Sequence, residues 1–106
     1  MRSLTVIAAG AMLGLGLAAP AWADPQASMT KAGCMACHAK DKKLVGPSFK
    51  DIAAKYKGQS GAVALLMEKS RKGGKGNWGP VPMPPNPESK ISDADLKAAV
   101  EFILQS

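Results

Sequence analysis

CMACH occupies residues 34–38 of this 106-residue chain. The spacing of Cys34 and Cys37 lets two thiols reach the two vinyl groups on one side of a porphyrin, and it leaves the imidazole of His38 facing the iron. His38 is the only histidine in the sequence, so no second imidazole is available as an iron ligand. The motif therefore predicts one covalently bound haem c, with His38 as an iron ligand.

Two other uses of these thiols have to be weighed. A thiol–disulfide exchange protein would need a βαβ context around Cys34 and Cys37, which the sequence lacks. A structural zinc site would need a fourth ligand beyond the two thiols and His38, and none is apparent at this tight spacing. Haem attachment accounts best for a histidine directly after the second cysteine.

Residues 1–23 have the form of a secretory leader. Arg2 precedes an uncharged apolar run over residues 4–17, and Ala21-Trp22-Ala23 has the small residues that signal peptidase requires. An uncleaved membrane anchor is the alternative, but the run is shorter than the ~20 apolar residues that span a bilayer. We expect cleavage before Asp24 and export to the periplasm, where bacterial haem c attachment is completed.

The expected mature chain, residues 24–106, is one small domain. The whole chain has 14 basic and 8 acidic residues, and removing the leader removes only Arg2, so the mature net charge is 13 − 8 = +5. A chain of this size has a thin core and usually needs a cofactor, metal or disulfide for stability. The sequence has no arginine-rich stretch of the kind that indicates nucleic-acid binding.

Four short helices are predicted, because apolar residues recur with helical spacing after residues that favour helix starts. These four starts are Asp24, Ser48, Ser60 and Ser92. Glycines are expected to end the first three helices, at Gly33, Gly58 and Gly73. No alternating strand pattern is present, so we predict an all-α single-haem fold.

Residues 73–90, GGKGNWGPVPMPPNPESK, form a different kind of segment. Its five prolines exclude a helix and most strand pairing. Four methionines follow the leader. Met29 and Met67 are better explained by packing, and Met35 lies inside the CMACH motif. Met83 lies between prolines that restrict the loop before the thioether binds. We therefore predict Met83 as the second iron ligand.

Two strong axial ligands would favour an electron carrier over an enzyme. The iron coordination then changes little between oxidation states, and substrates are kept off the metal. A haem peroxidase or gas sensor would need a labile sixth ligand and polar groups near it. The sequence offers no second histidine, and the loop around Met83 is apolar.

The chain resembles the small periplasmic class I cytochromes c, and most closely the cytochrome c-551 (cytochrome c8) group. The resemblance rests on KAGCMACHAKDKKLVGPSFKDIAAKY, GQSGA and NWGPVPMPPN, which lie within residues 31–86. It implies thioethers at Cys34 and Cys37 and axial ligation by His38 and Met83.

The resemblance also implies roles for residues around the ligands. The carbonyl of Pro47 would accept a hydrogen bond from His38. Trp78 would donate its indole N–H to a haem propionate, and Asn86 would steady the Met83 sulfur. Without the resemblance, Trp78 is a large apolar residue whose N–H needs a partner, and Asn86 is equally a turn residue. Lys69 and Arg71 both remain candidates for contact with a propionate.

The implied function is a soluble, monomeric electron carrier of the periplasm. It would carry single electrons between a membrane redox complex and a terminal reductase, oxidase or photosynthetic centre. Partner proteins would dock near the exposed haem edge with help from surface lysines, and the mature chain would not insert into a membrane. The candidate docking lysines are Lys31, Lys40, Lys42, Lys43 and Lys75.

Overall fold

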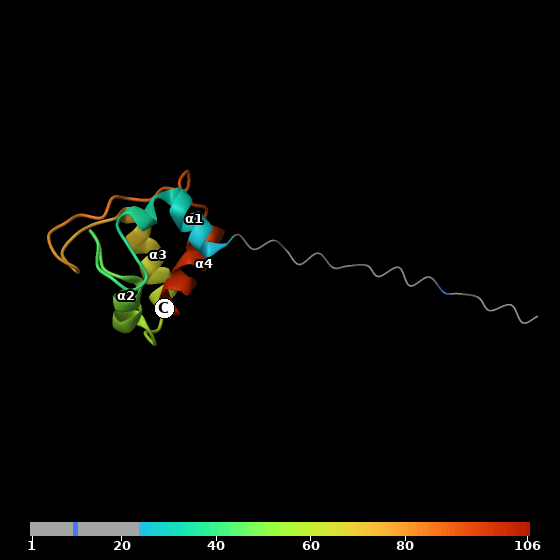
Figure 1. The fold of residues 1–106 in the computed structure, drawn as a ribbon, viewed down its shortest axis with the longest axis horizontal. Helices are drawn as coiled ribbons and strands as arrows, with labels where there is room; N and C mark the ends of the chain where they lie inside the picture. The colour runs from blue at the N-terminus through green and yellow to red at the C-terminus, as the bar shows by residue number, and fades with distance from the viewer. Residues whose placement is uncertain (1–9, 11–23) are drawn as a thin grey trace, which may run out of the picture.

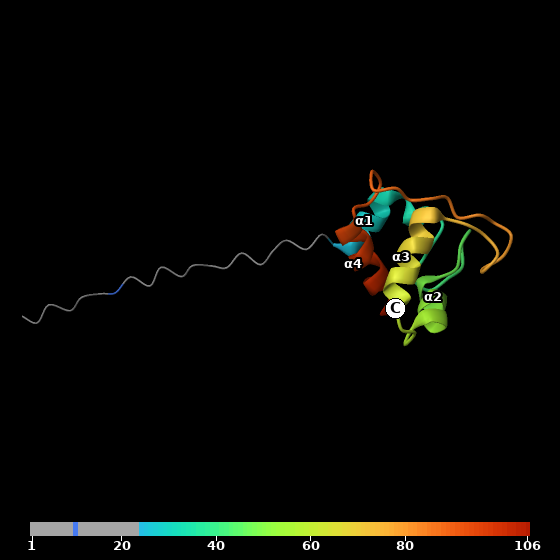
Figure 2. The ribbon, with the colours of Figure 1, turned by 180° about the vertical axis from the view of Figure 1, so that it is seen from behind.

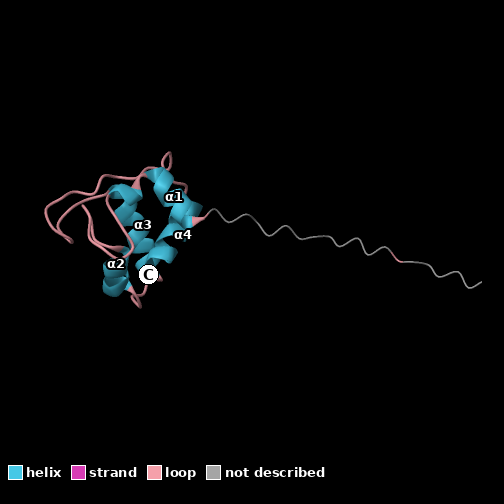
Figure 3. Ribbon diagram, viewed as in Figure 1, coloured by secondary structure: helices cyan, strands magenta, loops and turns pink. Residues whose placement is uncertain are grey.

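A computed structural model of the chain describes residue 10 and residues 24–106. Apart from Gly10, the expected leader lies outside the described residues. Residues 24–106 form four α-helices and one short 3₁₀ turn: α1 (Pro25–Ala32), η1 (Cys34–Ala36), α2 (Phe49–Tyr56), α3 (Ala62–Lys72) and α4 (Asp93–Leu104). Two isolated backbone bridges are the only β-type pairing in this part of the chain (Figure 3). The predicted all-α fold is confirmed.

Helix α4 lies at the centre of the packing and contacts α1, α2 and α3 (Figures 1 and 2). The core includes Met29 from α1, Phe49 from α2 and Val100 from α4, each at most 2 % exposed. Side chains of α3, including Leu66, pack against this core from one side. Three sequence-distant helices are therefore held together by one buried face of α4.

Three of the four predicted helix starts are correct, because a side-chain oxygen caps the first turn in each case. The Asp24 carboxylate accepts from the Gln26 amide at 3.1 Å. The Ser48 hydroxyl accepts from the Asp51 amide at 3.1 Å, and the Ser92 hydroxyl caps α4 in the same way at 3.2 Å.

The predicted start at Ser60 is wrong. Helix α3 begins after Gly61, which has a left-handed backbone (φ 75°) and gives no side-chain cap. The Ala62 amide donates to the Gln59 carbonyl at 3.3 Å, so a turn through the glycine takes the place of a serine cap. Only a residue without Cβ adopts this conformation at little cost.

Both long connections extend to the side of the molecule away from α4, and the second then runs back along the top to join α4 (Figures 1 and 2). One runs from the CMACH motif to α2 through residues 39–48, and the other runs from α3 to α4 through residues 73–92. None of the helices in residues 24–106 is long and apolar enough to cross a bilayer. The helices thus support two loops, and these loops carry most of the residues singled out from the sequence.

Candidate functional site

The CMACH motif lies at the sharp turn that follows α1. Gly33 ends the helix with a left-handed backbone (φ 88°), and the next residues form η1. The Cys37 and His38 amides both donate to the Cys34 carbonyl, at 3.2 Å and 3.0 Å. This tight winding brings both thiols and the imidazole to one cavity.

Both thiols are half-buried and are not joined in a disulfide. Burial raises the pKa of the Cys34 thiol above its ordinary value, with Lys90 nearby acting weakly in the opposite direction. A thiol is already mostly protonated at neutral pH at its ordinary pKa, and the raised pKa makes Cys34 a still poorer nucleophile for disulfide exchange. The site therefore does not favour the thiol–disulfide interpretation.

The His38 ring is held by the loop that leads to α2. Its Nδ1 lies 2.7 Å from the Pro47 carbonyl oxygen. A carbonyl only accepts, so Nδ1 carries the proton and the lone pair of Nε2 remains available to a metal. The ring also stacks on the buried Phe49, with centroids 5.7 Å apart.

Gly46 lies against the same imidazole. A Cβ at this position would be 2.6 Å from Cε1 of His38, so any larger residue would have to displace the ring. The Gly46 amide donates to the Cys37 carbonyl at 2.8 Å, which anchors the loop to the CMACH turn. His38 is thus fixed by a hydrogen bond, an aromatic contact and a steric limit.

Met83 lies on the loop that follows α3. Its backbone pairs with Gly74 in both directions: the Gly74 amide donates to Met83 at 3.0 Å, and the Met83 amide donates back at 2.8 Å. The paired residues close the neck of the segment 75–82. Gly73 packs so closely on the Met83–Pro84 backbone that a Cβ there would overlap the Met83 carbonyl oxygen and lie 2.9 Å from the Pro84 carbonyl carbon.

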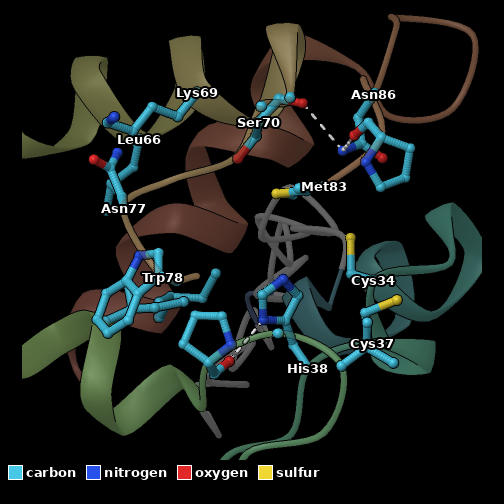
Figure 4. Close-up of a pocket in the computed structure, with 18 of the residues that line it drawn as sticks. Cys34, Cys37, His38, Leu66, Lys69, Ser70, Asn77, Trp78, Met83 and Asn86 are labelled. Atoms are coloured by element: carbon cyan, nitrogen blue, oxygen red, sulfur yellow. Dashed lines mark hydrogen bonds between the residues drawn. The ribbon is translucent and has the colours of Figure 1, made fainter. Parts of the chain in front are cut away.

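Residues of these two loops and of all four helices line a cavity of about 260 Å³ with mostly apolar walls. Cys34, Cys37, His38 and Met83 all line it. Figure 4 shows Met83 and His38 on opposite sides of the space, with the two cysteines along one flank and Trp78 on the other. Two thiols on one edge, with an imidazole and a thioether above and below, suit a flat porphyrin with a central iron.

The four methionines of residues 24–106 are not equivalent. Met35 and Met67 do not line the cavity, and both pack against the core. Met29 reaches the cavity but is 1 % exposed within α1. Met83 is the methionine that faces His38 (Figure 4).

Asn86 is buried where the Met83 loop meets the end of α3. Its side-chain amide donates to the Ser70 carbonyl at 3.0 Å and to the Pro84 carbonyl at 3.3 Å (Figure 4). Its backbone amide also donates to Ser70, at 3.1 Å. In this geometry Asn86 fixes the backbone on which Met83 is carried, and its amide hydrogens are directed at carbonyls.

Trp78 and Lys69 line the cavity, whereas Arg71 does not. Trp78 is 40 % exposed, and the Lys55 ammonium lies 4.8 Å from its ring centroid, within the range of a cation–π contact. The guanidinium of Arg71 contacts Ile91 and the first residue of α4, Asp93. Of the two residues considered for a propionate, Lys69 is therefore the one beside the cavity.

Gly46, Gly73 and the role of Arg71 were not found from the sequence. Gly73 is predicted only as a helix end, and nothing in the sequence singles out Gly46. Their contacts with His38 and Met83 join positions that are 8 and 10 residues apart. The only available signal is that each of these glycines lies near a predicted iron ligand in the sequence. This does not predict which residue the glycine contacts.

Comparison with known proteins finds related sequences. The sequence model of the Cytochrome c family matches residues 23–106. The chain is 44 % identical over 102 residues to cytochrome c-551 of Pseudomonas aeruginosa, covering 95 % of this chain and 91 % of the relative. It is 51 % identical over 84 residues to cytochrome c2 of Rubrivivax gelatinosus, covering 79 % of this chain and 99 % of the relative.

A solved structure is also similar. The crystal structure of cytochrome c552 of Nitrosomonas europaea superposes with a TM-score of 0.70 at 45 % identity, over 76 % of this chain and 96 % of that one. The likeness therefore extends from sequence to the arrangement of the helices.

Proposed function

Because the chain belongs to the cytochrome c family, within the class I cytochrome c-551 group, we propose that it carries electrons through a haem c ligated by His38 and Met83. Membership of the family brings one covalently bound haem c and the role of an electron carrier rather than an enzyme. The proposal adds the ligands, the residues that hold them and the setting in which the carrier works.

The observation that carries the proposal is the placement of four donor side chains around one apolar cavity. Cys34 and Cys37 would supply the thioether links, and His38 and Met83, which lie on opposite sides of the cavity, would ligate the iron. The haem supplies an iron centre that gains or loses one electron, and a thioether ligand favours the reduced state. The protein's part is to hold both ligands in place and to keep other molecules out.

Residues next to the ligands support this role. Pro47 fixes the protonation and orientation of the His38 ring by its 2.7 Å hydrogen bond, which also makes the imidazole a stronger donor to the metal. Asn86 holds the Met83 loop onto α3. Trp78 and Lys69 lie at the cavity wall, where an indole N–H and an ammonium group suit a propionate carboxylate.

The ligation is tested by near-infrared and visible spectra of the purified holoprotein. The oxidised wild type is expected to show a weak long-wavelength sulfur-to-iron charge-transfer band that Met83→Ala abolishes. Met67→Ala is the matched control and should keep the band, because Met67 lies outside the cavity. A high-spin wild-type spectrum without this band would refute ligation by Met83.

The proposal also covers the setting of the carrier. Residues 1–23 act as a cleaved leader, which sends residues 24–106 to the periplasm as a monomer. There the protein accepts electrons from a membrane redox complex and passes them to a terminal reductase, oxidase or photosynthetic centre. Mass determination of the mature protein from a periplasmic extract should give a chain that begins at Asp24, with the added mass of one haem.

Partner docking uses exposed lysines near the haem edge. The candidates Lys31, Lys40, Lys42, Lys43 and Lys75 are all exposed. Attraction between these ammonium groups and an acidic partner weakens as salt rises. Electron-transfer rates with a membrane preparation should therefore fall with ionic strength, and rates that stay constant would refute the docking proposal.

A further inference from the structure

Arg71 lies in the last turn of α3, and its side chain is only 21 % exposed. Its guanidinium makes three contacts with residues that follow Met83 along the chain. Nη1 donates to the carbonyl of Asn86 at 3.0 Å and to that of Ile91 at 2.7 Å. Nη2 pairs with the Asp93 carboxylate at 2.6 Å. One side chain therefore joins α3 to three points spread over eight residues.

The contacts close a surface excursion of the chain. Residues 87–90 leave the body of the protein after Asn86 and return at Ile91, and all four are exposed. Asn86 and Ile91 themselves are buried, at 7 % and 4 % exposure. Arg71 binds the carbonyls at both ends of this excursion, so its charge-assisted hydrogen bonds hold the exit and the return against α3.

The first of these carbonyls is mechanically coupled to Met83. Only Pro84 and Pro85 separate Asn86 from Met83, and proline rings lock φ in both residues. The same stretch is pressed on Gly73, so it has little room to move toward α3. A stiff, confined segment transmits a displacement of Asn86 to the Met83 backbone.

Resting on the Met83 ligation proposed above, we propose that Arg71 is a positioning residue that holds Met83 at the iron by fixing the carbonyls of Asn86 and Ile91. It acts through the backbone and does not touch the haem, since it does not line the cavity. The planar fork of the guanidinium serves both carbonyls from one nitrogen and the carboxylate from another, which a lysine ammonium cannot reproduce.

Competition with imidazole tests the inference. Imidazole binds the oxidised iron only in molecules from which Met83 has been displaced, so its apparent affinity reports how often the loop releases the sulfur. Arg71→Ala should bind imidazole about tenfold more tightly than the wild-type holoprotein, which corresponds to about 1.4 kcal/mol. The imidazole affinity of Arg71→Lys should lie between those of the wild type and Arg71→Ala. The readout is a spectral titration at neutral pH.

Two controls separate positioning from general stability. Lys72 is the neighbour of Arg71 in α3, and Lys72→Met removes its exposed ion pair with Glu68. The imidazole affinity of this variant should stay within about twofold of that of the wild type. Ala53→Gly weakens α2 at a buried position outside the cavity, and it should also stay within about twofold. If Ala53→Gly raises the imidazole affinity as much as Arg71→Ala does, the inference is overturned.

An imidazole affinity of Arg71→Ala within about twofold of the wild type would overturn the inference. If Arg71→Ala does not accumulate as holoprotein, Arg71→Gln is used in its place. An imidazole affinity more than about threefold tighter than that of the wild type would then support the inference, and a smaller change would overturn it. Met83→Ala separates the two proposals. If it binds imidazole no more tightly than the wild type, the ligation itself is wrong; if it binds far more tightly while Arg71→Ala does not, only the role of Arg71 is wrong.

Discussion

Gly73→Ala is the substitution for which the structure predicts the sharpest effect. Gly73 has φ 68° and ψ −161°, a backbone conformation that is almost confined to glycine, and imposing it on alanine costs about 1–3 kcal/mol. The new Cβ would also overlap the Met83 carbonyl oxygen and lie 2.9 Å from Pro85 N. Forcing one extra carbon into a packed contact costs about 1–3 kcal/mol more.

Gly76→Ala is the matched control for this substitution. Gly76 lies in the same loop with φ 108°, so alanine is strained there too, but a Cβ would meet nothing within 4 Å. The difference between the two variants isolates the contact with the Met83 segment. It should be about 1–3 kcal/mol in the free energy of unfolding.

Guanidinium chloride unfolding of the two holoproteins measures this difference. With a denaturant dependence of about 3 kcal/mol per molar, the midpoint of Gly73→Ala should lie about 0.3–1 M below that of Gly76→Ala. Gly73→Ala should also weaken the sulfur-to-iron band of the oxidised protein, whereas Gly76→Ala should retain it. Equal midpoints together with two unchanged bands would refute the reasoning.

Three further predictions concern the fold. Ser48→Ala should destabilise the protein by about 0.5–2 kcal/mol in denaturant unfolding because it removes the cap of α2, while Ser60→Ala should cost nothing measurable; equal losses would contradict the assigned helix starts. Phe49→Ala should cost about 3–5 kcal/mol in the same assay because the side chain is 2 % exposed, and a loss below about 1 kcal/mol would contradict its place in the core. The hydrogen bond from Arg71 holds the pKa of Asp93 below its ordinary 3.8, so the stability that the pair adds is present above that pH and is lost as the pH falls through the lowered value. Asp93→Asn should therefore lower the melting temperature more at pH 7 than at pH 2, and an equal drop at both would contradict this pairing.

Local signals in the sequence predicted the helices well. Asp24, Ser48 and Ser92 cap their helices because a short polar side chain bonds to the next turn, which depends on neighbouring residues alone. Ser60 misled the prediction because it resembles a cap, while Gly61 supplies the turn by its backbone. The choice between the two depends on how the chain enters α3, and composition does not reveal it.

The site was predictable where residue type implies chemistry. The CMACH motif and the proline-flanked Met83 indicated a cofactor and its ligands, and the structure brings these side chains to one cavity. The partners of Arg71 were not predictable, because its hydrogen bonds join positions 15 and 20 residues apart. Such contacts arise from the packing of loop on helix, and no spacing rule encodes them.

We propose that this cytochrome c exchanges electrons through an iron ligated on both sides by His38 and Met83. Mixing the reduced holoprotein with carbon monoxide at neutral pH tests this claim most directly, with ferricyanide oxidation measured in parallel. We expect rapid oxidation by ferricyanide and no carbon monoxide adduct on that timescale, while Met83→Ala should bind carbon monoxide readily. Rapid carbon monoxide binding by the wild-type protein would contradict the claim.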